Sequence, residues 1–338
     1  MKEIRLGIVG AGFMGQLHAQ SASGLETAQL AAIVDMNAQL GSDVAGRYGA
    51  THYRDIDAAL AADAADAYIV VLPDTLHRDV TVRLLEAGKP VLVEKPMAHA
   101  LDDAKAMARA EKSGGRLMVG QILRFDPRYN QAAQAVRNGE IGEPLHGSSG
   151  RFTNSELGLR MNGGSSVCFY LGVHDVDALQ WISGQNVTRV FSRQVSKQMP
   201  KLGVQSEDAY FTTCEMTSGM VGQLYFGWTL PKGIPTGLWA RTEVIGTEGV
   251  IDLDVRDSGL RMLASGGWSL PDGVHWPEVN GRIMGDLYEE QRHFVQAVRE
   301  DLTFLVPTPD ALRNVAVNDA ILRSVKSGQP EDVENWDI

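Results

Sequence analysis

A glycine-rich turn near the N-terminus constrains the fold of this chain more than any other feature. The turn Gly10-Ala11-Gly12-Phe13-Met14-Gly15 lies between an apolar strand, residues 4–10, and the start of a helical pattern. Gly10 permits a tight turn, Gly12 lets backbone N–H groups approach a pyrophosphate, and Gly15 lets the helix pack closely on the sheet. We expect a dinucleotide-binding unit, although a glycine-rich turn that binds nothing is the alternative reading.

An acidic residue at the end of the next strand supports the dinucleotide prediction. Asp35 lies 20 residues after Gly15, where a carboxylate grips the adenosine ribose hydroxyls. The five residues that follow, 36–40, include no Arg or Lys. A 2′-phosphate would therefore meet a carboxylate with no cation beside it, so the sequence predicts NAD rather than NADP as the cofactor.

The order of strand and helix patterns predicts two domains with different folds. Apolar strands at residues 4–10, 29–35, 67–72, 90–93 and 117–121 alternate with helical patterns, as in a doubly wound parallel sheet. After a helix within 124–138, glycine and polar turns separate β-like stretches at 145–153, 187–195, 209–216, 220–230, 239–245 and 250–253. Further helices are expected at 173–182, 287–299 and 310–327. The predicted fold class is α/β plus α+β, with a Rossmann domain over 1–123 and a mostly antiparallel sheet domain over 124–338.

Composition and charge exclude several classes of function. The net charge is −11, with no basic run and no interleaving of basic and aromatic residues, which argues against nucleic acid as a partner. No apolar run has the length of a membrane span, and the first residues do not resemble a signal peptide. Two cysteines cannot build a disulfide framework or a four-thiolate zinc site, and we see no ligand cluster for a metal. We therefore expect a cytoplasmic protein without a metal.

Two strand ends of the first domain carry candidate site residues. Leu72-Pro73 and Glu94-Lys95-Pro96 each follow an apolar strand, and open α/β sheets bind ligands at the carboxyl ends of their strands. Lys95 would then point toward the nicotinamide, and Glu94 could orient it. A solvated Glu-Lys turn is the alternative from spacing alone. The location also suggests a cis peptide bond between Lys95 and Pro96.

A histidine in the second half is the candidate proton acceptor. His174 lies in Gly172-Val173-His174-Asp175-Val176-Asp177, near the predicted start of a helix. Neutral imidazole is the usual proton acceptor near pH 7. A surface histidine in the first turn of a helix is the alternative.

Taken together, these segments resemble the Gfo/Idh/MocA family, which includes glucose-fructose oxidoreductase and the inositol dehydrogenases. The likeness covers nearly the whole chain, and it also includes Arg124-Phe125-Asp126-Pro127 and the turn Gly246-Thr247-Glu248-Gly249. The resemblance implies a Rossmann domain joined to an open-faced sheet domain that makes oligomer contacts. It also implies oxidation or reduction of a secondary carbinol on a sugar or cyclitol, with Lys95 as the active-site lysine and His174 as the catalytic base.

One position departs from the family pattern. The family commonly has an aspartate four residues before the histidine, and this chain has Tyr170 there. A tyrosine supplies no fixed negative charge near neutral pH, but it can give a hydrogen bond and a ring face for a sugar. The Asp–Lys–His arrangement of the family is therefore incomplete.

We thus predict an NAD-dependent dehydrogenase of a sugar, sugar derivative or cyclitol that forms a homodimer or homotetramer. Two alternatives stay open: an NAD-dependent glycosidase of the same fold, and a catalytically silent regulator that responds to NAD or a sugar.

His77 could touch the cofactor or pack at a helix start. The expected catalytic residues are Lys95, His174 and Tyr170. The expected cofactor contacts are Gly10, Gly12, Phe13, Met14, Gly15, Asp35, Leu72, Pro73, His77, Glu94, Lys95 and Gln121. The expected substrate contacts are Lys95, Arg124, Tyr170, His174 and Asp175.

Overall fold

The chain forms two compact units, and the first is assembled from two separate segments. The computed structural model describes residues 3–112, 114–232, 234, 237–256 and 259–335. The first unit comprises Met1–Phe125 and Val274–Leu312, and the second comprises Asp126–Gly273 and Arg313–Asp337. The first boundary lies two residues beyond the one expected from the sequence. Residues 274–312, expected in the second domain, cluster with the first unit because helix α10 (Asp286–Glu300) packs against α1 (Phe13–Ala22) and η2 (Ile122–Phe125).

The first unit is a Rossmann-like parallel sheet with strand order β3-β2-β1-β4-β5-β6. Apart from the short edge strand β3, the strands are mostly buried and apolar, as expected when helices cover both faces of a sheet. They are β1 (Ile4–Val9), β2 (Ala28–Val34), β3 (Thr51–Tyr53), β4 (Ala67–Val70), β5 (Pro90–Glu94) and β6 (Arg116–Gly120). The remaining helical elements are α2 (Ala38–Tyr48), α3 (Ile56–Ala61), η1 (Asp74–Leu76), α4 (His77–Glu86) and α5 (Leu101–Glu111). A short ladder pairs β15 (Glu278–Val279) with β16 (Arg282–Ile283).

Local sequence explains where several of these helices begin and end. Asn37 caps α2 by accepting a hydrogen bond from the Leu40 N–H, and Asp55 caps α3 in the same way through the Ala58 N–H. Gly49 ends α2 in the left-handed region, with φ of 69°. The sequence analysis missed α3 and the three-residue strand β3.

The second unit is built on a seven-stranded sheet with order β12-β11-β7-β10-β9-β8-β17. Its pairings are antiparallel except for the parallel pair β7–β10, so the sheet is mostly antiparallel as predicted. The strands are β7 (Pro144–Asn154), β8 (Val187–Val195), β9 (Ala209–Met216), β10 (Val221–Leu230), β11 (Leu238–Gly246), β12 (Val250–Asp254) and β17 (Glu331–Asp332). The helices are α6 (Pro127–Arg137), α7 (Ser155–Met161), α8 (Val173–Ser183), α9 (Gln198–Lys201) and α11 (Thr308–Ser327), which starts in the first unit. A hairpin joins β13 (Met262–Ala264) to β14 (Gly267–Ser269).

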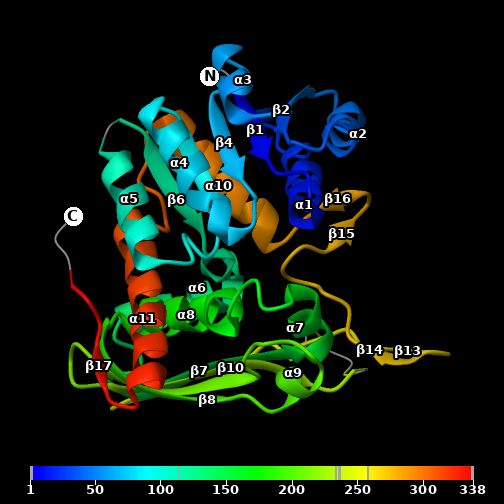
Figure 1. The fold of residues 1–338 in the computed structure, drawn as a ribbon. Coiled ribbons are helices and arrows are strands. Elements are labelled where there is room, and N and C mark those ends of the chain that lie inside the picture. Colours follow the sequence, from blue (N-terminus) through cyan, green and yellow to red (C-terminus); the bar gives the residue numbers. More distant parts are fainter. Residues whose placement is uncertain (1–2, 113, 233, 235–236, 257–258, 336–338) are drawn as a thin grey trace. The chain divides into compact units, whose positions relative to one another are not determined.

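The two faces of this second sheet differ. Helix α8 packs on β7, β10 and β11 and covers one face (Figure 1). On the other face alternate side chains are exposed, including Phe191, Phe211 and Trp239. Because the residues of a strand alternate between faces, this pattern marks an open-faced sheet.

None of the helices in the described part of the chain combines the length and the apolar composition that a bilayer span requires.

Candidate active site

The glycine-rich turn has the shape that a dinucleotide requires. Gly10 has φ of +102°, and a Cβ added to Gly15 would lie 1.9 Å from the Gly10 carbonyl oxygen. A side chain at either position is therefore excluded. A Cβ on Gly12 would meet no heavy atom within 4 Å, so the space above the N-terminus of α1 is open. Phe13 and Met14 begin the helix there. Its first N–H groups can meet a diphosphate in this space, so the turn fits NAD.

Backbone hydrogen bonds fix the carboxylate of Asp35 beside this turn. Its Oδ2 accepts from the Ala11 N–H at 2.7 Å, and its Oδ1 accepts from the Asn37 N–H at 2.8 Å. The His52 ring also lies 2.9 Å from the Asp35 carbonyl oxygen. Met36 follows with 82% of its surface exposed. A ribose placed at this strand end would meet this fixed carboxylate, and ribose binding by Asp35 stays a prediction.

Strand register brings the second predicted segment to the same edge of the sheet. Val9 of β1 pairs with Val70 of β4, which pairs with Val93 of β5. The three strands therefore end level, and the Glu94–Lys95 corner lies about 10 Å from the glycine turn at ordinary strand spacing. The peptide bond between Lys95 and Pro96 is cis, which confirms the prediction.

The ring of His77 lies between the loop that follows β4 and the loop that follows β5. The ring is buried, with Nδ1 2.9 Å from the Pro96 carbonyl oxygen and Nε2 2.9 Å from the Leu72 carbonyl oxygen. The ring thus bridges the segment after β4, which includes Pro73, and the segment after β5. This placement supports packing at the helix start, the second of the two roles left open by the sequence.

Two other predicted residues of the first unit are also buried. Gln121 follows β6, and its backbone N–H donates to the Val119 carbonyl oxygen. The Arg124 guanidinium donates to the Leu305 carbonyl oxygen at 3.0 Å and to Asp310 Oδ2 at 2.8 Å. These bonds tie η2 to the segment after α10, and substrate binding by Arg124 stays a prediction.

The candidate base lies at the start of α8 in the second unit. His174 is 9% exposed and follows a π-helical turn, η3 (Cys168–Gly172), that contains Tyr170. Such turns occur frequently at functional sites. A Cβ on Gly172 would lie 2.5 Å from the Phe226 ring, so the glycine allows this backbone to approach β10 closely. The Tyr170 ring lies 6.4 Å from that of Trp228. His174 and Tyr170 thus belong to consecutive turns of one helical segment.

Asp175 faces the sheet beneath α8. It is fully buried, its Oδ1 accepts from the Ser149 hydroxyl at 3.0 Å, and its Oδ2 lies 3.4 Å from Arg151 Nε. Burial raises the pKa of Asp175 to about 6 despite the opposing effects of Arg151 and Ser149. These contacts anchor the start of α8 to β7, and the expected substrate contact of Asp175 stays a prediction.

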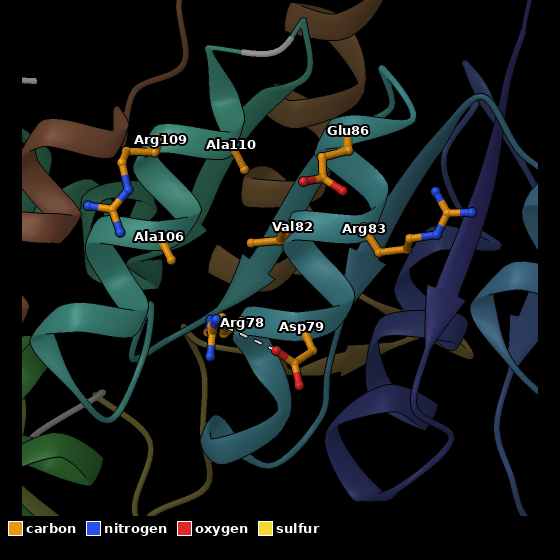
Figure 2. A pocket seen from close by; sticks show the side chains of 8 residues that line it. All are labelled: Arg78, Asp79, Val82, Arg83, Glu86, Ala106, Arg109 and Ala110. Atoms are coloured by element: carbon orange, nitrogen blue, oxygen red, sulfur yellow. Dashed lines mark ion pairs between the residues drawn. The ribbon is translucent and has the colours of Figure 1, made fainter.

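A groove between α4 and α5 is lined by none of the predicted site residues. It has a volume of about 420 Å³. Figure 2 shows the side chains that line it, three of which are arginines. Arg83 pairs with Asp57 at 2.7 Å, and Arg78 pairs with Asp103 at 3.5 Å. Two of its arginines are thus already paired with acidic residues. The lining residues are Arg78, Asp79, Val82, Arg83, Glu86, Ala106, Arg109 and Ala110.

The sequence analysis missed His18, which contacts Glu94, and Gln291, which contacts His18. His18 of α1 lies 2.9 Å from a Glu94 carboxyl oxygen, and Gln291 of α10 lies 2.8 Å from the other side of the His18 ring. The one available signal was that His18 follows Gly15 by three residues on a helix that must pack against the sheet.

Comparison with known proteins places the chain in a family. Residues 4–121 match a model described as an oxidoreductase family with an NAD-binding Rossmann fold, and residues 129–252 match the GFO/IDH/MocA C-terminal domain. The rhizopine catabolism protein MocA of Rhizobium meliloti is 30% identical over 253 residues, which cover 74% of this chain and 78% of that protein. The chain belongs to the Gfo/Idh/MocA oxidoreductase family.

Other members match over nearly the full length. The scyllo-inositol 2-dehydrogenase (NAD(+)) of Bacillus subtilis is 28% identical, covering 98% of this chain and 97% of its own length. The crystal structure of myo-inositol 2-dehydrogenase from Lactobacillus plantarum aligns with a TM-score of 0.86 at 21% identity, covering 98% of this chain and 100% of that one. The structural match confirms the Gfo/Idh/MocA fold.

Proposed function

We propose that this protein is an NAD-dependent dehydrogenase that acts on a secondary carbinol of a cyclitol, sugar or sugar derivative. The position of Lys95 carries the proposal, because the lysine lies at the same sheet edge as a turn shaped for a dinucleotide. Full-length similarity to an inositol dehydrogenase supports the substrate class. The two buried free cysteines are consistent with a reducing cytoplasm as its compartment.

Each candidate residue has a definite task in this reaction. NAD supplies, when bound, a nicotinamide ring that takes up or returns a hydride. His174 accepts the proton of the substrate hydroxyl, and Lys95 stabilises the negative charge that develops on the same oxygen. Tyr170 offers a hydroxyl and a ring face in place of the family's aspartate. Reduction uses the same groups in the opposite direction.

A substrate screen tests the proposal against both alternatives. The purified protein is mixed with NAD and a panel of cyclitols, sugars and glycosides, and both reduced nicotinamide and sugar products are measured. Reduced nicotinamide that accumulates with a cyclitol or free sugar supports the dehydrogenase. Cleaved glycoside without net NADH would indicate the glycosidase, and NAD binding without turnover of any compound would indicate the regulator.

NAD should bind at least about tenfold more tightly than NADP, a difference of about 1.4 kcal/mol. The held carboxylate of Asp35 would repel a 2′-phosphate, and Met36 and Asn37 offer no cation. Titration calorimetry measures both affinities. The double variant Asp35→Ser/Met36→Arg should shift the preference toward NADP, whereas the control Asp43→Ser, an exposed change on α2, should not. Equal affinities of the native protein for the two cofactors would contradict the assignment.

The open face of the second sheet is the proposed subunit interface. Phe152, Phe211 and Tyr225 cluster on it with ring centroids 6.0 to 6.5 Å apart, and Phe211 is 50% exposed. An apolar cluster of this kind on a soluble protein is typical of an interface.

We therefore expect a homodimer or homotetramer, and Phe211→Glu should dissociate it by placing a charge in the aromatic cluster. Light scattering gives the mass, and Leu302→Glu in the first unit is the control for an exposed leucine. A native protein that stays at the monomer mass of 36.7 kDa at micromolar concentration would refute the interface.

A further inference from the structure

A buried polar cluster lies behind the Glu94–Lys95 corner, and three separate elements of the first unit build it. His18 comes from α1, Glu94 from the end of β5, and Gln291 from α10. His18 Nε2 lies 2.9 Å from Glu94 Oε1, and Gln291 Nε2 lies 2.8 Å from His18 Nδ1. Both His18 and Gln291 are fully buried. Buried polar side chains need such partners, so the contacts specify one arrangement.

The hydrogen bonds of Gln291 determine which nitrogen of the His18 ring donates. Gln291 Nε2 also lies 3.3 Å from the carbonyl oxygen of His18, which can only accept. The amide group at this position is therefore the NH₂ end, and Nδ1 of His18 accepts from it. This leaves Nε2–H as the donor that faces the Glu94 carboxylate.

The second carboxylate oxygen of Glu94 continues this series of hydrogen bonds to the backbone of Lys95. Glu94 Oε2 accepts from the backbone N–H of Lys95 at 3.0 Å. Burial raises the pKa of Glu94, but the His18 hydrogen bond and the nearby Lys95 charge outweigh burial and hold that pKa below its ordinary value. Glu94 is thus an ionised carboxylate with one oxygen held by His18 and the other by Lys95.

A second buried carboxyl group, that of Glu290, lies close to Glu94. Glu290 is fully buried, and a Cβ added to Gly120 would lie 3.6 Å from its Oε1 and 3.5 Å from Glu94 Cα. Burial, the charge of Glu94 and the charge of Asp286 raise the pKa of Glu290 well above its ordinary value. This shift favours the neutral, protonated form of Glu290.

We propose that His18 is a positioning residue for Lys95. Its Nε2–H holds the Glu94 carboxylate in the orientation in which Oε2 accepts the Lys95 N–H, and Gln291 fixes the ring tautomer that does so. The inference rests on the proposed function, because the position of Lys95 affects turnover only if Lys95 acts on the substrate. It adds a role for α10, which couples the lysine to a segment almost 200 residues later in the chain.

The test compares two substitutions of His18 with a control on α10. His18→Asn removes the donor at the Nε2 position, whereas His18→Gln can place an amide N–H near it. His293→Asn is the control, since this half-buried histidine accepts from the Leu305 N–H at 2.9 Å, a contact that does not involve Glu94. Circular dichroism and thermal melting establish that each variant is folded.

The first measurement needs no substrate. An amine-reactive ester is added to the intact protein, and mass spectrometry follows the rate at which Lys95 is acylated across a range of pH. His18→Asn should change this rate by about threefold or more, while His18→Gln and His293→Asn stay close to the native rate. An unchanged rate in folded His18→Asn, or an equal change in the Gln and Asn variants, would overturn the proposal.

The second measurement separates this proposal from the proposed function. With a substrate in hand, His18→Asn should lower kcat by roughly tenfold or more and leave the Kd of NAD nearly unchanged. If acylation responds as expected but the native protein turns over no sugar or cyclitol, the dehydrogenase assignment fails and the positioning role stands. If His18→Asn does not fold, Gln291→Met takes its place. This variant should change Lys95 acylation in the same direction by a smaller amount, and no change would overturn the proposal.

Discussion

Replacement of His174 by alanine should lower kcat by roughly 10²–10⁴-fold while the affinity for NAD stays nearly unchanged. The loss follows from removing the group that takes the hydroxyl proton as the hydride leaves. NAD affinity is spared because the glycine turn and Asp35 belong to the first unit, whereas His174 belongs to the second. Steady-state kinetics on a turned-over cyclitol or sugar, with calorimetry for NAD, measures both quantities.

Two further observations make the test of His174 specific. Native activity should decline on the acid side, because an imidazolium cannot accept a proton, and this decline should be absent from the residual activity of the variant. The matched control is His146→Ala, which removes an exposed histidine from β7 of the same unit. If His174→Ala kept native turnover on a true substrate, the base would have to be sought at Lys95 or Tyr170. Tyr170→Phe then shows whether the tyrosine hydroxyl takes part or the ring only packs against Trp228.

Replacement of Lys95 by methionine should lower kcat by roughly 10²–10³-fold. Methionine keeps most of the length of the side chain and removes the charge, so the alkoxide that forms during oxidation loses its stabilising cation. The measurement is again kcat and KM with the identified substrate. Lys89→Met is the control, because Lys89 lies immediately before β5, opposite to the end that carries Lys95, and pairs with Asp63 at 2.9 Å.

The double variant tests whether the two residues act on one oxygen. Groups that serve the same transition state give strongly non-additive losses. Lys95→Met combined with His174→Ala should therefore cost far less than the product of the two single effects. A double variant whose loss equals that product would mean that the two residues act independently.

The parts of the fold that the sequence predicted are those with local causes. The glycine turn was predictable because Gly10 and Gly15 meet steric limits that only glycine satisfies. The buried strands and the helices α8, α10 and α11 follow from their apolar patterns. Strands β3 and β17 were not predicted, since segments of two or three residues carry too little pattern and owe their existence to neighbouring strands.

Sequence motifs identified the candidate site residues. They did not reveal the contacts that hold those residues in position. His18 was missed because its partner Gln291 is 273 positions away, a contact that no local spacing reveals. The π-helical turn before His174 was missed because apolar periodicity does not distinguish it from an ordinary turn. Arg124 and Asp175 were expected to contact the substrate. In the structure Arg124 pairs with Asp310 and Asp175 pairs with Arg151, and no sequence motif links the members of either pair.

The split composition of the first unit has a consequence for how the protein is made. A ribosome releases Met1–Phe125 long before it synthesises Val274–Leu312, which includes α10. Until then the emerging nucleotide-binding sheet lacks the helix that buries His18, and Glu94 lacks part of its support. The intervening sheet unit can be completed only with Arg313–Asp337, later still. Neither unit can therefore be excised with a single cut, and each reaches its final form only after its second segment has been synthesised.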